Sequence, residues 1–165
     1  MNQVAAAGVD RLAIRSVAAA LGLAPNALYR YFVNLAALEA ALAEESRRRL
    51  LEALQKAVGK KSPKEAVRSI AQAYVRFARE QPHIFSLTLL PSDTDTEDDA
   101  THTRSWQFVL EHVARIYGDR RAPEAAVALW AFLHGMTALE AARVFGERKP
   151  VSSFEFGLRI WFAGM

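Results

Sequence analysis

The sequence predicts an all-α protein of about nine helices, in which a small N-terminal head of three helices is joined to a larger helical body. Alanine, leucine, arginine and glutamate, all good helix formers, are abundant, and the alternation of apolar and polar residues that is typical of strands is missing. Glycines and prolines divide the chain into segments of helix length. The 165 residues suffice for a small module and one larger core.

Breaks between apolar-periodic segments give the expected helices in order. They are 2–7, 14–21, 25–32, 35–58, 63–81, 83–90, about 100–117, 124–145 and about 151–165. Asn34 is the expected N-cap of the long fourth helix. Ser62 and Pro63 are the expected N-cap and first residue of the fifth. The long helix links the two expected domains, 1–45 and 46–165.

Charge is unevenly distributed along the chain. Residues 1–61 hold nine Lys and Arg against five Asp and Glu, whereas residues 62–165 hold twelve against thirteen. A polyanionic partner for the N-terminal third and an ordinary fluctuation of surface charge explain this equally well.

Several classes of protein are disfavoured by composition. The chain has no cysteine, which excludes disulfides, thiolate metal ligands and cysteine nucleophiles and is consistent with a cytoplasmic location. Its apolar runs are far shorter than a membrane span, and no signal peptide is apparent. Glycine-rich phosphate loops and the G-x-S-x-G motif are also missing, so no catalytic residue, cofactor or enzymatic activity is expected.

The segment IRSVAAALGLAPNALYRYF, residues 14–32, has the pattern of a helix-turn-helix. Ala18 is small where the two helices would cross, and Gly22 suits the turn between them. Leu28 and Phe32 occupy one face at i, i+4 spacing and would form the core. The side chains expected to face DNA are Arg15, Asn26, Ala27, Tyr29, Arg30 and Tyr31. The alternative is a purely structural helical hairpin with aromatic core residues.

With its continuation NLAALEAAL, this segment resembles the helix-turn-helix of TetR-family regulators over about residues 5–45, most specifically in the run ALYRYF. The resemblance implies an all-helical homodimer whose heads bind double-stranded DNA and whose bodies bind a small-molecule effector. It also implies that Tyr29 and Tyr31 contact phosphates, while Arg30 approaches bases or backbone. Two departures are a short segment before Gly8 and a leucine, Leu35, where the family commonly has a lysine.

Bulky apolar side chains in the body suggest a pocket for an apolar effector. The expected ligand-binding residues are Tyr74, Phe77, Phe85, Leu89, Trp106, Leu110, Trp130 and His134. For any single one, simple core packing is the favoured alternative. The residues Trp130 to Gly135 form a WxxxHG pattern that resembles the C-terminal domain of the TetR subgroup called WHG. His134 has no second histidine at i±3 or i±4, so a structural or ligand-contacting role is favoured over metal binding.

The eighth expected helix is apolar on two faces, which is typical of a helix buried on both sides. One side would face the core and the other a second subunit, joined by the ninth helix in a four-helix interface. The expected interface residues are Leu129, Phe132, Met136, Leu139, Phe154, Leu158, Trp161 and Phe162.

These observations favour a ligand-responsive transcriptional regulator, most simply a repressor that an effector releases from a palindromic operator. One alternative is a ligand-binding and dimerisation module whose DNA binding is weakened or lost. An all-helical enzyme would require a cluster of polar groups that the sequence does not indicate.

Overall fold

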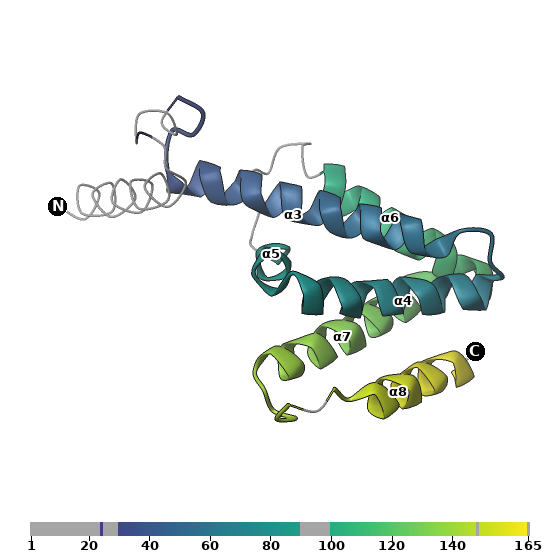
Figure 1. Ribbon diagram of the computed structural model, residues 1–165. Helices are drawn as coiled ribbons and strands as arrows, with labels where there is room; N and C mark the ends of the chain where they lie inside the picture. Colours follow the sequence, from purple (N-terminus) through teal and green to yellow (C-terminus); the bar gives the residue numbers. More distant parts are fainter. Residues whose placement is uncertain (1–23, 25–29, 90–99, 148, 165) are drawn as a thin grey trace.

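A computed structural model describes residue 24 and residues 30–89, 100–147 and 149–164. All regular secondary structure within these residues is helical (Figure 1). The helices are α3 (Leu35–Val58), α4 (Pro63–Glu80), α5 (Pro82–Leu87), α6 (Ala100–Tyr117), α7 (Ala122–Ala141) and α8 (Val151–Ala163). None of the helices in this part of the chain is long and apolar enough to cross a membrane.

The starts of α3 and α4 confirm the predicted caps. The Asn34 side-chain oxygen accepts a hydrogen bond of 2.8 Å from the backbone N–H of Ala37, which satisfies one of the free N–H groups of the first turn. At α4, the backbone N–H of Ser62 donates to the Glu65 carboxylate at 3.1 Å, and Pro63 is the first helical residue. The hydrogen bonds from Ser62 lower the pKa of Glu65.

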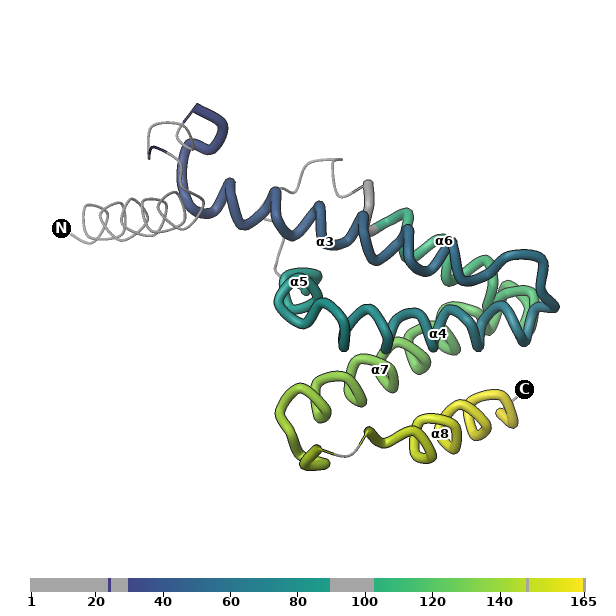
Figure 2. The backbone as a smooth tube through the Cα atoms, viewed as in Figure 1, coloured from purple at the N-terminus to yellow at the C-terminus, as the bar shows by residue number. Residues whose placement is uncertain are grey.

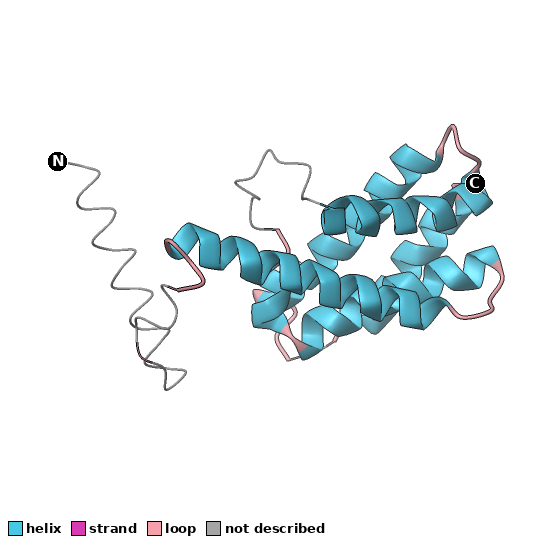
Figure 3. Ribbon diagram, turned by 90° about the horizontal axis from the view of Figure 1, so that it is seen from above, coloured by secondary structure: helices cyan, strands magenta, loops and turns pink. Residues whose placement is uncertain are grey.

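Helices α3, α4, α6 and α7 enclose the hydrophobic core. Helix α3 packs against α4, α5 and α6, and α7 packs against α4 and α6. The stripe predicted on α4, from Ala66 through Ile70 and Tyr74 to Phe77, is buried throughout. The N-terminal turns of α3 project beyond the other described helices in two perpendicular views (Figures 1 and 3).

Helices α7 and α8 run in opposite directions at one side of the bundle (Figure 2). They approach closely because Gly157 has no side chain: a Cβ at this position would lie 2.3 Å from the ring of Phe132. The same ring stacks on Phe154, with centroids 6.2 Å apart. A glycine on α8 therefore allows a large aromatic ring of α7 to fill the space between the two helices.

Trp161 attaches the C-terminal end of α8 to the bundle. Its indole N–H donates to the carbonyl of Ala125 in α7 at 2.9 Å. Its own carbonyl accepts a hydrogen bond from the Tyr117 hydroxyl of α6. These two bonds join the last turn of α8 to two other helices.

Six of the nine predicted helices have counterparts, and the count of nine is not supported. The helices expected at 2–7 and 14–21 lie outside the described residues. The one expected at 25–32 does not reach its predicted end, because Arg30 and Tyr31 form a turn and Phe32 is not helical.

Two C-terminal boundaries were also wrong. The helix expected over 83–90 is the shorter α5, and the helix expected to reach Phe145 ends at Ala141. In the second case the chain leaves the helix through a series of turns in which Arg143 has φ +55° and Gly146 has φ +63°. A residue in the left-handed region cannot continue a right-handed helix.

Candidate functional site

A cavity of about 130 Å³ lies between α3, α4, α6 and α7, next to the end of α5. Its lining residues are Arg47, Leu50, Leu54, Ile70, Tyr74, Thr88, Leu89, Ser105, Trp106, Val109, Leu129, Trp130 and Leu133. Most of these side chains are apolar, as in pockets for small organic molecules.

Of the eight predicted ligand-binding residues, Tyr74, Leu89, Trp106 and Trp130 line this cavity. A second, more open cleft of about 550 Å³ is lined by Phe85 and His134, with Leu89 shared between the two. The remaining two lie in neither: Phe77 is buried in the core, and Leu110 packs against it. The structure thus brings six of the eight to two adjacent hollows, but whether they bind a ligand stays a prediction.

Sequence analysis missed the polar residues of the cavity, above all Arg47 and Ser105. Arg47 is only 6 % exposed, and its Nε lies 3.7 Å from the Glu44 carboxylate. Its position carried a signal, because it shares a helical stripe with Leu50 and Leu54. Arginine on the apolar stripe of a helix is rarely buried without a specific role.

An aromatic cluster around His134 separates the cavity from the second cleft. The Tyr74 hydroxyl lies 3.1 Å from His134 Nδ1, and Phe85 stacks on the imidazole with centroids 5.6 Å apart. The edge of Tyr74 in turn meets the face of Phe85 at 5.3 Å. Tyr74 lines the first hollow and His134 the second, so this cluster forms part of the wall between them.

Burial sets the protonation states of this cluster. It raises the pKa of Tyr74 to about 12, chiefly because a buried phenolate loses its hydration. It lowers the pKa of His134, because the imidazolium would be poorly solvated. Both groups are therefore neutral near pH 7, and the tautomer with the proton on Nε2 lets Nδ1 accept the phenol's proton.

Two of the predicted DNA-binding residues lie in the described region. Arg30 and Tyr31 sit in the turn before α3 and are exposed, Tyr31 by 76 %. Arg15, Asn26, Ala27 and Tyr29 lie outside the described residues. The exposure of Arg30 and Tyr31 leaves both side chains accessible to a partner.

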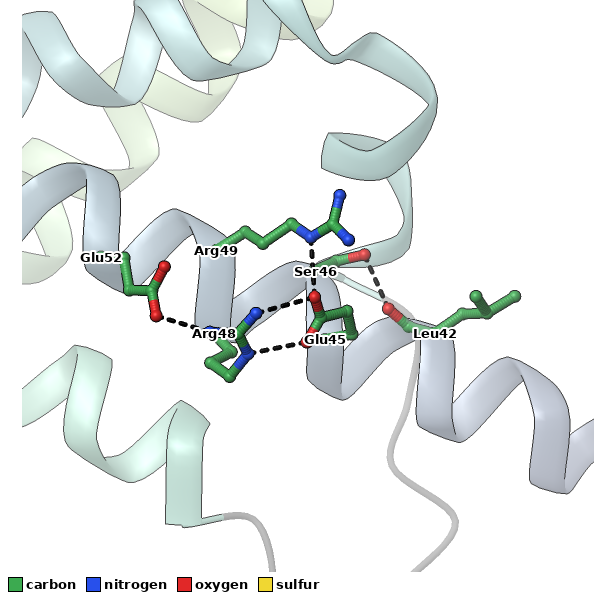
Figure 4. A network of polar contacts seen from close by, with 6 residues as sticks. All are labelled: Leu42, Glu45, Ser46, Arg48, Arg49 and Glu52. Atoms are coloured by element: carbon green, nitrogen blue, oxygen red, sulfur yellow. Dashed lines mark hydrogen bonds and ion pairs between the residues drawn. The ribbon is translucent and has the colours of Figure 1, made fainter. Parts of the chain in front are cut away.

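The exposed face of α3 carries a network of ion pairs (Figure 4). Glu45 accepts hydrogen bonds from Arg48 and Arg49, and Arg48 also donates to Glu52. The two arginines lower the pKa of Glu45 to about 2. Part of the positive charge counted in the N-terminal third is therefore neutralised on α3, so that surplus alone is weaker support for a polyanionic partner.

An uncharged apolar face runs along α7 and continues onto α8. Its exposed residues on α7 are Val127, Ala128, Trp130, Ala131, Gly135, Ala138 and Leu139, and those on α8 are Phe156 and Ile160. The predicted interface residues only partly coincide with this face. Leu139 is exposed, whereas Leu129, Phe154 and Leu158 are buried in the chain's own core. Phe132, Met136, Trp161 and Phe162 are partly buried against that core.

Comparison with known proteins places the described bundle in a family. Residues 67–160, more than half of the chain, match the family described as "Tetracyclin repressor-like, C-terminal domain". An uncharacterized HTH-type transcriptional regulator of Bacillus subtilis (strain 168), YobS, is 26 % identical over 164 residues, which cover 96 % of this chain and 84 % of that protein.

Two solved structures share the fold. A protein with unknown function from Rhodococcus sp. RHA1 has a TM-score of 0.75 at 23 % identity, covering 92 % of this chain and 84 % of that one. A possible TetR family transcriptional regulator from Streptomyces coelicolor A3(2) has a TM-score of 0.62 at 20 % identity, covering 92 % and 87 %. At these identities the two structures support the fold alone.

Proposed function

This chain belongs to the TetR family of transcriptional regulators, and we propose that it is a dimeric, ligand-responsive, DNA-binding repressor of the cytoplasm. The observation that carries the proposal is the position of α3. This helix begins at Leu35, directly after the predicted DNA-binding segment, and lines the cavity with Arg47, Leu50 and Leu54. A molecule in the cavity would therefore touch the same helix that leads to the head.

The head, residues 1–45 in the proposed division, would read an operator through its helix-turn-helix. The proposed boundary with the body, residues 46–165, falls inside α3, so the two domains would share this helix. Each head would place its recognition helix in the major groove, and a dimer would favour a pseudo-palindromic operator. Tyr31 and Arg30, exposed just before α3, support a surface that faces DNA.

The apolar face on α7 and α8 would pair with a second copy. It contains no charged residue among those named above, and Phe156 and Ile160 are 55 % and 58 % exposed. Two copies related by a two-fold axis would bury this face in a four-helix interface. The side chains that meet across it would then be this exposed set rather than the buried Leu129, Phe154 and Leu158.

Effector binding would act by linkage. A ligand shifts the balance between a DNA-binding and a released conformation only by the difference in its affinity for the two. Because four helices wall the cavity, a change in its contents alters the packing of α3 against α4 and α6. We propose no catalytic role: Tyr74, Phe85 and Trp130 surround His134 with aromatic rings.

A mobility-shift assay of the full chain against its own upstream DNA tests this function. We expect a specific shift that weakens as salt rises, because phosphate contacts release counterions. Arg30→Ala should weaken the shift and lower its salt dependence by about one unit of slope per lost contact. Arg120→Ala, which removes an exposed arginine in the turn between α6 and α7, is the matched control and should change neither. Failure to find any salt-sensitive shift would favour a ligand-binding module that has lost DNA binding.

A further inference from the structure

The 130 Å³ cavity has one feature that a purely apolar ligand does not explain: polar groups stand in an otherwise hydrophobic wall. The first is Arg47, a cation only 6 % exposed. A guanidinium carries five N–H donors in a planar fork, so it can bind an anion of a ligand in addition to its ion pair with Glu44.

The second polar group is the Ser105 hydroxyl. Its Oγ is buried, and nothing in the described part of the chain forms a hydrogen bond with it. A buried hydroxyl without a partner is destabilising, so natural proteins usually provide one. The other two hydroxyls in the wall already have partners: Thr88 donates to the Phe85 carbonyl, and Tyr74 pairs with His134.

Arg47 and Ser105 stand at the same end of the cavity. Helices α3 and α6 pack together and run in the same direction in both perpendicular views (Figures 1 and 3). Arg47 precedes Leu54 by two turns of α3, and Ser105 precedes Val109 by one turn of α6. The cavity is therefore polar where these helix segments begin and apolar where they end.

We propose that the effector is a small monocarboxylate with an apolar body. Its carboxylate pairs with Arg47 and accepts a hydrogen bond from Ser105, and its aromatic or short aliphatic body lies between Leu54 and Val109. This inference rests on the proposed function for the word effector, but the binding itself is tested without DNA.

The dimensions of the cavity set the size of the ligand. A cavity of about 150 Å³ accepts benzene, and this one measures about 130 Å³. Along α3, Arg47 and Leu54 are about 10 Å apart at the usual helical rise. Benzoate or hexanoate fits these limits, whereas a long acyl chain exceeds them.

Titration calorimetry of the full chain with benzoate and with benzamide tests the proposal, because the two differ mainly in charge. We expect benzoate to bind at least about tenfold more tightly than benzamide, as a charge-assisted fork provides. Hexanoate and hexanol form a second pair of probes with the same expected order. Chemical-shift changes at the amides of Arg47 and Ser105 should accompany binding of the acids.

Variants assign the preference to the two residues. Arg47→Met keeps the apolar stem and should reduce the preference for benzoate over benzamide to about twofold or less. Ser105→Ala should weaken benzoate binding about threefold to tenfold without lowering thermal stability, because its hydroxyl has no partner to lose in the described structure. Arg48→Met is the matched control, since Arg48 lies on the exposed face of α3 and should leave binding unchanged.

If Arg47→Met does not fold, Arg47→Lys and Ser105→Ala provide the same test with smaller changes. The proposal is overturned if benzamide binds as well as benzoate, if neither probe binds, or if the preference survives loss of Arg47. These outcomes are separate from the mobility shift. A chain that binds DNA but not carboxylates refutes this inference alone, and a chain that binds benzoate but no DNA refutes the proposed regulatory function alone.

Discussion

His134 illustrates how single residues in this fold depend on their surroundings. The rings of Tyr74, Phe85 and Trp130 pack around it, and burial lowers its pKa. An unfolded chain has the ordinary histidine pKa of about 6.5, so on acidification the unfolded state takes up the proton first. The contribution of His134 to stability is therefore fully present above about pH 6.5 and is lost as the pH falls from there through its folded pKa.

Urea unfolding between pH 5 and pH 8 measures this effect. We expect the free energy of unfolding to fall on the acidic side, and His134→Gln to flatten that dependence while leaving an amide oxygen to accept from Tyr74. His83→Gln, a change at an exposed position of α5, should keep the parent pH profile. Equal slopes for all three chains would show that His134 does not hold a lowered pKa.

The individual cavity residues were only partly predictable. Helical periodicity identifies which side chains turn inward, and it placed Tyr74, Trp106 and Trp130 correctly on the inner side. It does not say which inward side chains meet one another and which border empty space. Leu129 was assigned to the subunit interface for that reason, although it lines the cavity, and Arg47 was overlooked because charged residues are ordinarily placed outside.

Among the elements, α8 depends on one small residue. Replacing Gly157 with alanine would place a Cβ 2.3 Å from the Phe132 ring, so the ring or the helix must move. We expect Gly157→Ala to lower the free energy of unfolding by about 1–3 kcal/mol, as overpacked sites do. Gly164→Ala is a suitable control at the end of the same helix, where the nearest atom to a new Cβ is 3.6 Å away. Indistinguishable urea midpoints for the two variants would contradict this account.

Helix starts were easier to predict than helix ends. Asn34 and Ser62 mark their helices through side chains that bond to the first turn, and that chemistry is visible in the sequence. The end of α7 has no such mark. The segment after Ala141 still consists largely of helix-compatible residues, and the break occurs where Arg143 adopts a positive φ. Such a conformation depends on how α8 folds back, which local sequence does not specify.

At the scale of the whole molecule, the apolar face of α7 and α8 predicts self-association. Ile160→Glu would place a charge in the middle of a buried interface, which is strongly unfavourable without a partner. We expect this variant to sediment as a monomer at concentrations at which the parent chain is a dimer, and to bind a two-half-site DNA more weakly. Val144→Glu replaces an equally exposed apolar residue in the turn after α7 and should leave the mass unchanged. A parent chain that sediments as a monomer would refute the proposed dimer.

The overall architecture was largely predictable because a helical bundle is encoded by local signals. Periodicity, caps and breakers fixed six elements and their order, and their apolar stripes fixed the common core. The shape of the cavity was not predictable in the same way, because it depends on how imperfectly four separate helices fill the space between them.

Helix α3 can also be regarded as a lever with its pivot at the cavity. Its 24 residues form one continuous rod, and the first turns project free of the other described helices. Leu35 lies about 18 Å before Arg47 at the usual rise of an α-helix. A rotation of about 10° around Arg47 would therefore carry Leu35 through about 3 Å, by the same helical geometry. A rearrangement of only a few atoms beside Arg47 is thus magnified, by length alone, at the end of the rod where the predicted head begins.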